Sequence, residues 1–230
     1  MTSSSVCWPT RVAAEVESVL ASLACVLYAQ LVRVSLRLPQ RATYADYLAA
    51  EQDSPSRHEY IDGVIVAMAG GSDEHNAIAG RFAGLFAARA RSKCLYFTPD
   101  QRFWIPATAR GRYSDGSIIC GKPEHPAHDD QASTNPTVVL DVLSPSSEGD
   151  DEGDKRKDFQ SLPSLQAYVV ATQDARRVKV YRRTEAGKWA AAPDVYNEGE
   201  SFELPALTAA IAVADIYTDI LDANGRSLLR

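Results

Sequence analysis

One apolar run constrains the fold of this chain more than any other feature, because it carries a single carboxylate at its centre. Residues 138–143 have the sequence VVLDVL, which is typical of a buried central strand. Alternation along a strand places Val139, Asp141 and Leu143 on one face. A buried carboxylate needs a metal ion, a lysine or arginine, or backbone N–H groups as partners. An ordinary buried ion pair or hydrogen-bonded aspartate is the structural alternative to a functional site.

Helix and hairpin signals precede this run. Thr43 is a predicted N-cap for a short helix ending near Gln52, with Asp46 in the capping-box position. The pair Asp62-Gly63 between two apolar runs predicts a β-hairpin. A second helix is expected from a Ser72 cap to about Arg91, and its buried face would comprise Ile78, Phe82, Leu85 and Phe86.

Strand-like segments then alternate with helical ones. The expected strands are CLYF (94–97), RFWI (102–105), SIIC (117–120), AYVVA (167–171) and RVKVYR (177–182), besides the central run. A polar loop at 121–136 and an acidic loop leading into a helix near residue 155 separate them. This alternation predicts an α/β fold in which helices flank a mixed β-sheet.

Composition sets the size and the class of protein. The chain has 230 residues, of which 45% are hydrophobic and 23% charged, as in a soluble globular protein. We expect a helical extension at 1–40, one domain at 41–220 and a tail at 221–230. The net charge of −6 argues against a protein that coats nucleic acid non-specifically. A nuclease is still allowed, because bound cations can neutralise an acidic site.

The cysteines and the N-terminal segment bear on location. Cys7, Cys25, Cys94 and Cys120 show no paired spacing, so we expect no disulfide framework or zinc site and a cytoplasmic setting. Residues 12–38 are rich in Val, Leu and Ala, but their uncharged part, 19–32, is short for a membrane span. We interpret this segment as an added helix without stable membrane association, with a targeting or membrane-associated stretch as the alternative.

Two further residues extend the candidate site. Asp115 lies just before the SIIC strand, although Ser-Asp-Gly is also ordinary turn chemistry. Helical spacing places Lys155 on the same side as Phe159 and Leu162, toward the sheet. Two carboxylates on neighbouring strands with a lysine would suit Mg²⁺ or Mn²⁺. Mg²⁺ usually takes one or two carboxylates and keeps several waters, so a phosphate can also bind it. The acidic run at 148–154 is expected to support the helix that carries the lysine.

Several ordered blocks resemble a known family. The segments RHEYIDGVIVAMAGGSDEHNAIAGRF, YSDGSIICG, NPTVVLDVLSPSSE and SLPSLQAYVV are similar to the Uma2 family of restriction-endonuclease-like proteins. The resemblance implies a PD-(D/E)xK fold and a site made of Glu59, Asp115, Asp141 and Lys155. Ser114 stands where the family has proline, and Asp141 stands where it usually has glutamate. A carboxylate one methylene shorter could displace a metal by about an ångström, which can lower a rate roughly 10²-fold.

These features lead to one main functional expectation and two alternatives. The first is a Mg²⁺- or Mn²⁺-dependent endonuclease acting on DNA, with Asp115, Asp141 and Glu59 as metal ligands. Lys155 would stabilise the transition state. A catalytically weakened module that binds nucleic acid or a protein partner is the second, and a hydrolase of small phosphate compounds is the third. A homodimer is left open, and His75 is expected to be a structural hydrogen-bonding residue.

Overall fold

The computed structural model describes residues 41–68, 70–143, 148–220 and 226–227. The chain divides into two compact units, residues 1–41 and 42–230, and the second contains the helices and strands below. The helix expected within residues 12–38 lies outside the described residues, as do Cys7 and Cys25. Within the described part of the chain, no helix is long and apolar enough to cross a membrane.

The second unit begins with a capped helix and a hairpin, as predicted. Helix α2 (Tyr44–Gln52) starts at Thr43, whose side chain accepts a hydrogen bond from the N–H of Asp46 in a complete capping box. Strands β1 (His58–Ile61) and β2 (Val64–Ala67) follow. Asp62 and Gly63 join them with φ values of 51° and 84°, as a type I′ turn requires. Local sequence therefore determines this part of the fold.

The hairpin belongs to a five-stranded sheet in the order β2-β1-β5-β4-β7. Its other members are β4 (Arg102–Ile105), β5 (Arg110–Arg112) and β7 (Ala132–Ser133). The sequence predicts only β4 among these three, because β5 and β7 are too short and too polar to show an apolar alternation. The segment Arg110–Arg112 is a strand because its arginine side chains meet buried carboxylates instead of solvent.

A six-stranded mixed sheet carries the predicted central run. Its order is β11-β10-β9-β8-β6-β3, with β8 parallel to β9 and antiparallel to β6. In chain order, its strands are β3 (Cys94–Phe97), β6 (Gly116–Cys120), β8 (Val138–Val142), β9 (Ala167–Ala171), β10 (Arg177–Arg182) and β11 (Asp194–Asn197). The expected mixed sheet is therefore present, and the central run lies inside it.

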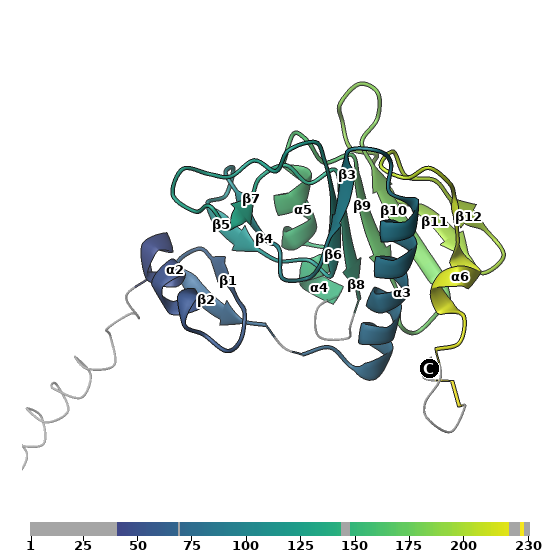
Figure 1. The fold of residues 1–230 in the computed structure, drawn as a ribbon, viewed down its shortest axis with the longest axis horizontal. Helices are drawn as coiled ribbons and strands as arrows, with labels where there is room; N and C mark the ends of the chain where they lie inside the picture. Colours follow the sequence, from purple (N-terminus) through teal and green to yellow (C-terminus); the bar gives the residue numbers. More distant parts are fainter. Residues whose placement is uncertain (1–40, 69, 144–147, 221–225, 228–230) are drawn as a thin grey trace, which may run out of the picture. The chain divides into compact units, whose positions relative to one another are not determined.

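Helices flank this sheet (Figure 1). Helices α3 (Asp73–Arg89) and α6 (Val213–Tyr217) lie on one face, together with the short pair β12 (Ser201–Phe202) and β13 (Ile211–Ala212). The other face is covered by α5 (Asp154–Gln160), which follows the single turn α4 (Glu148–Asp151). The arrangement is a restriction-endonuclease-like α/β fold.

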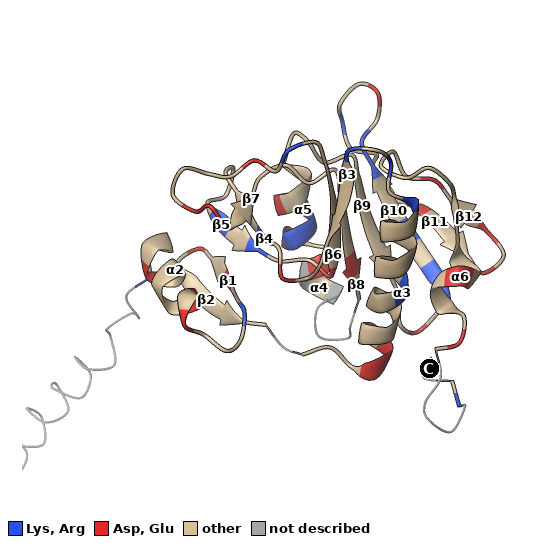
Figure 2. Cartoon of the chain, viewed as in Figure 1, with Lys and Arg blue, Asp and Glu red and all other residues tan. Residues whose placement is uncertain are grey.

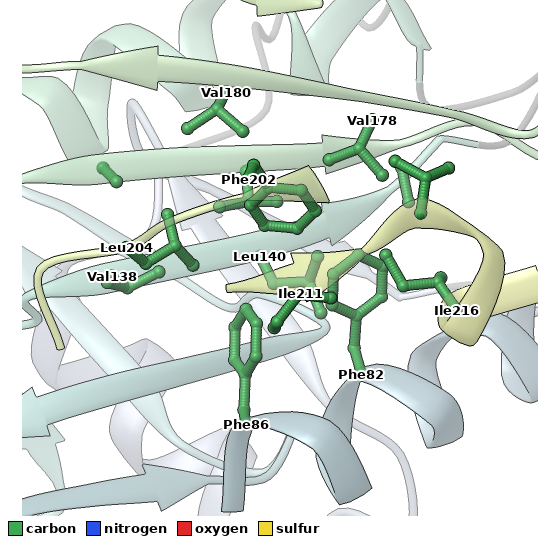
Figure 3. Packing of buried hydrophobic residues seen from close by; sticks show 14 of the residues in the cluster. Phe82, Phe86, Val138, Leu140, Val178, Val180, Phe202, Leu204, Ile211 and Ile216 are labelled. Carbon is green, nitrogen blue, oxygen red and sulfur yellow. The ribbon is translucent and has the colours of Figure 1, made fainter. Parts of the chain in front are cut away.

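The two faces of β8 pack into two separate cores. Val138 and Leu140 lie in the first core, to which Phe82 and Phe86 of α3 also belong (Figure 3). On the opposite face, Val139 lies in the second core with α5 and β4 residues. The predicted alternation is thereby confirmed, and it places Asp141 on the face that α5 covers.

The expectation that the cysteines form no disulfide is wrong for one pair. Cys94 of β3 and Cys120 of β6 form a disulfide bond. The two residues lie directly opposite each other in the antiparallel register, although 26 positions separate them in the sequence. Spacing along the chain could not indicate this pair, because strand register brings it together. The argument from cysteine usage for a reducing compartment therefore fails.

Candidate active site

Asp141 is fully buried near the end of β8 and has three hydrogen-bond donors. The ammonium group of Lys155 donates to its Oδ1 at 2.9 Å, and the hydroxyl of Tyr168 donates to its Oδ2. The backbone N–H of Asp115 also points at Oδ1, at 3.3 Å. The partners of this carboxylate are thus a lysine, a tyrosine and a backbone N–H group.

Lys155 occupies the first turn of α5 and points into the protein. Its Nζ also donates to Oδ1 of Asp151, at 3.1 Å, so that one cation joins two carboxylates. Lys157 lies on the exposed side of the same helix and pairs with Asp154 at 3.1 Å. Figure 2 shows the acidic segments of β8 and α4 beside the basic start of α5. The helical spacing therefore predicted the direction of Lys155 correctly.

Asp115 is the exposed end of this cluster. It lies between β5 and β6, and its side chain keeps 21% of its surface exposed. Its Oδ2 accepts the N–H of Val142 at 2.7 Å, and its Oδ1 lies 3.1 Å from Nε2 of His75. The backbone N–H of Asp115 reaches Asp141, and of these two carboxylates only that of Asp115 keeps part of its surface exposed.

Asp115 and His75 line a cleft with a volume of about 780 Å³. Residues from α2, the loops around β1 and β2, the start of α3 and the β3–β4 turn complete its walls. Gly71 lies against the imidazole of His75, because a Cβ at this position would be 2.5 Å from Cδ2 of the ring. The missing side chain at Gly71 therefore allows His75 to sit beside Asp115.

Glu59 lies in a separate network. Its Oε2 accepts from Nη1 of Arg112 at 2.7 Å, and its Oε1 accepts the N–H of Tyr113 at 2.9 Å. The Nε of Arg112 in turn donates to Asp158 of α5 at 2.8 Å. Glu59 affects the cluster electrostatically, because its charge helps to raise the pKa of Lys155. The structure thus brings Asp115, Asp141 and Lys155 together and leaves Glu59 beside them.

The electrostatics distinguish the two central carboxylates. Burial raises the pKa of Asp141, and the charges of Asp151 and Asp115 raise it further, against the opposing effect of Lys155. Burial also acts to raise the pKa of Asp115, but the hydrogen bond from His75 and the charge of Lys155 hold it below its usual value. Two neighbouring carboxyl groups with pKa values shifted apart are typical of functional sites.

The cations of the cluster respond to the same carboxylates. Burial by itself lowers the pKa of Lys155, but Asp141 and Asp151 outweigh it and raise the pKa well above the usual range. Burial lowers the pKa of His75 too, and the hydrogen bond and charge of Asp115 reverse that effect. Lys155 is therefore a permanent cation of the cluster.

Sequence reasoning missed two members of the cluster. Asp151 is buried, accepts from Lys155, and receives the Tyr168 hydroxyl at its backbone carbonyl at 3.0 Å. Its four-residue separation from Lys155 is the helical spacing of an ion pair, which was a usable signal. Tyr168 lies in the buried strand AYVVA, where a hydroxyl needs a partner just as the carboxylate of Asp141 does.

The oxygen atoms of this cluster fit a hard divalent cation in their chemistry. Each oxygen of Asp115 accepts one hydrogen bond and retains a lone pair, and so does Oδ2 of Asp141. In the described part of the chain, no group of three or more His, Cys, Asp or Glu side chains could hold a metal ion. Mg²⁺ usually keeps several waters and takes only one or two carboxylates, so two carboxylates would suffice in number.

The mixed sheet, its flanking helices and the buried carboxylate–lysine cluster define a restriction-endonuclease-like protein. A model of the Uma2 family, described as "Putative restriction endonuclease", matches residues 44–214. The chain belongs to the Uma2 family. The sequence-based resemblance is thereby confirmed.

Similar proteins agree with this assignment. The chain is 30% identical over 148 residues to protein sll1609 of Synechocystis sp., covering 64% of this chain and 84% of that protein. It is 31% identical over 173 residues to protein slr1290 of the same organism, covering 75% and 89%. The crystal structure of a "putative nuclease belonging to DUF820" from Anabaena variabilis has a TM-score of 0.62 at 15% identity, covering 76% of this chain and 97% of that one. At this identity the structural likeness concerns the fold.

Proposed function

We propose that this protein is a divalent-metal-dependent endonuclease that hydrolyses phosphodiester bonds in DNA. The observation that carries the proposal is the convergence of Asp115, Asp141 and Lys155 behind an open cleft. Membership of the Uma2 family and the similarity to a protein described as a nuclease support it. Asp115 faces the cleft, so a backbone phosphate bound there could reach its carboxylate.

Each residue has a distinct task in this proposal. Asp115 and Asp141 would hold Mg²⁺ or Mn²⁺, which when bound supplies Lewis acidity and a more acidic water. Lys155 holds the carboxylate of Asp141 in place and provides positive charge for the transition state. His75 orients Asp115 by donating its Nε2–H to Oδ1, in keeping with its expected role as a hydrogen-bonding residue.

Glu59 acts at a distance in the same scheme. We infer a positioning role, because both of its oxygens already accept hydrogen bonds from Arg112 and Tyr113. Arg112 connects Glu59 to Asp158, which lies one turn after Lys155 on α5. The Glu59–Arg112–Asp158 chain would therefore fix the helix that carries the lysine.

Nicking of supercoiled plasmid DNA tests the proposed function. The protein should convert supercoiled plasmid to open circles with Mg²⁺ or Mn²⁺, and a chelator should stop the reaction. Relaxation measured on agarose gels over time gives the rate. A folded, metal-saturated protein that nicks neither this plasmid nor linear DNA would contradict the proposal.

A non-catalytic module is the second candidate, and one observation favours it. Asp141 is fully buried and already paired with Lys155 and Tyr168, as in a structural ion pair. Such a protein would keep the fold and use the cleft to bind nucleic acid or a protein partner. Calorimetric titration separates the two candidates, because a module of this kind should bind no Mg²⁺ or Mn²⁺ up to millimolar concentrations.

The substitution His75→Gln should lower Mn²⁺ affinity about 10- to 100-fold, the usual effect of losing a residue that orients a metal ligand. The substitution removes the imidazole, whose Nε2 lies 3.1 Å from Oδ1 of Asp115. His58→Gln is a matched control, because His58 also pairs with a carboxylate, Glu51, at 2.9 Å. Calorimetry should give wild-type affinity for the control, and equal affinity for both variants would refute the orienting role.

A further inference from the structure

The cleft beside Asp115 contains few positive charges. Among the described residues that line it, Arg57 and Arg102 are the two with a permanent cation. Arg102 is buried, and its Nε and Nη2 donate to Asp129 at 2.9 and 2.8 Å. Since these two donors are committed inside the protein, Arg57 is the cation of the cleft wall that can approach a ligand.

Arg57 forms an ion pair with Asp100 that is exposed to solvent. Its Nη1 lies 2.7 Å from Oδ1 of Asp100, and the two side chains are 42% and 78% exposed. An exposed pair of this kind contributes little to stability, so another anion can replace the carboxylate. The backbone of Arg57 is fixed separately, because its carbonyl accepts the N–H of Met68 at 2.9 Å.

Asp100 is more firmly placed than its partner. It lies in a turn that follows β3, where the N–H of Gln101 donates to the carbonyl of Thr98 at 3.0 Å and Pro99 fixes the backbone. The hydroxyl of Thr98 also donates to Oδ2 of Asp100, at 3.3 Å. For Arg57 to exchange Asp100 for another anion, only the Arg57 side chain has to rotate. The segment that holds Asp100 keeps its conformation.

We propose that Arg57 binds a backbone phosphate of the DNA strand in this cleft, in competition with Asp100. The inference rests on the proposed nuclease function, since the same cleft exposes Asp115. A guanidinium group suits this task because its planar fork matches two phosphate oxygens. With a net charge of −6, the protein needs a local cation to hold a polyanion near its acidic site. Asp100 would keep weakly held anions away from that cation.

Equilibrium DNA binding without divalent metal, measured over a range of salt concentrations, tests this proposal. Arg57→Ala should weaken binding and reduce the slope of log K against log salt by about 0.9, the contribution of one phosphate contact. Asp100→Asn should instead raise affinity, by up to roughly fivefold, because it removes the competing charge. Opposite effects on the two sides of one ion pair would not arise from misfolding.

The exposed pair Arg176–Glu198 provides matched controls, because neither residue is among those that line this cleft. Arg176→Ala and Glu198→Gln should leave the salt slope unchanged. If wild type binds DNA and Arg57→Ala keeps its slope, the inference is wrong while the proposed function stands. If the wild type binds no DNA at low salt, the inference is overturned, and plasmid nicking with divalent metal decides the proposed function separately.

Discussion

Replacing Lys155 by methionine is expected to lower the free energy of unfolding by about 3–5 kcal/mol and to abolish DNA cleavage. The change leaves Asp141 and Asp151 buried without the ammonium group that joins them at 2.9 and 3.1 Å. Breaking a buried ion pair by removing one partner has a cost of about this size. Urea denaturation monitored by circular dichroism gives the stability, and plasmid nicking gives the activity.

Two variants separate this effect from a general loss of helix stability. Lys157→Met lies on the same helix at an exposed site and should change stability by less than about 0.5 kcal/mol. Adding Asp141→Asn to Lys155→Met should recover part of the lost stability, because one unpaired charge is removed. Recovered stability should not restore cleavage. If Lys155→Met is as stable as Lys157→Met, the buried cluster is wrongly described.

The second large effect is expected for Asp115→Asn, which should reduce the nicking rate on the order of 10³-fold. The substitution removes the charge of the exposed carboxylate, and a loss of about 4 kcal/mol of transition-state stabilisation corresponds to that factor. Stability should fall by only about 1 kcal/mol, because the amide oxygen can still accept the N–H of Val142. Single-turnover nicking rates with saturating protein measure the effect.

Asp194→Asn is the control for charge removal, since Asp194 pairs with Arg182 on an exposed strand. It should nick at the wild-type rate. A rate for Asp115→Asn within tenfold of wild type, at the same metal concentration, would remove Asp115 from the catalytic site. The loss of activity with retained stability is what distinguishes Asp115 from Lys155.

Periodicity predicted the directions of two buried members of the site, Asp141 and Lys155. The alternation in VVLDVL placed Asp141 on the face that α5 covers, and helical spacing turned Lys155 toward it. Asp115 could not be predicted this way, because Ser-Asp-Gly before a strand is also common in turns. Its position depended on the family resemblance. The structure adds that its N–H reaches Asp141, a contact between residues 26 positions apart.

The predictions failed where distant segments decide the outcome. Arg112, in the segment RGR, has the local pattern of a solvated residue, but it is buried between Glu59 and Asp158. Glu59 was placed in the metal site by the family resemblance, and its pairing with Arg112 could not be seen without knowledge of β5. The Cys94–Cys120 disulfide was missed for the same reason. Strand register and the pairing of buried charges are long-range properties that local patterns do not encode.

The most direct test of the central claim is the position of a bound metal ion. A crystal of the wild-type protein soaked in Mn²⁺ should give an anomalous difference peak in contact with the carboxylates of Asp115 and Asp141. The same soak of an Asp115→Asn crystal should give no peak there. An active wild-type protein whose anomalous peak lies away from these two residues, or whose site stays empty at saturating Mn²⁺, would contradict the account.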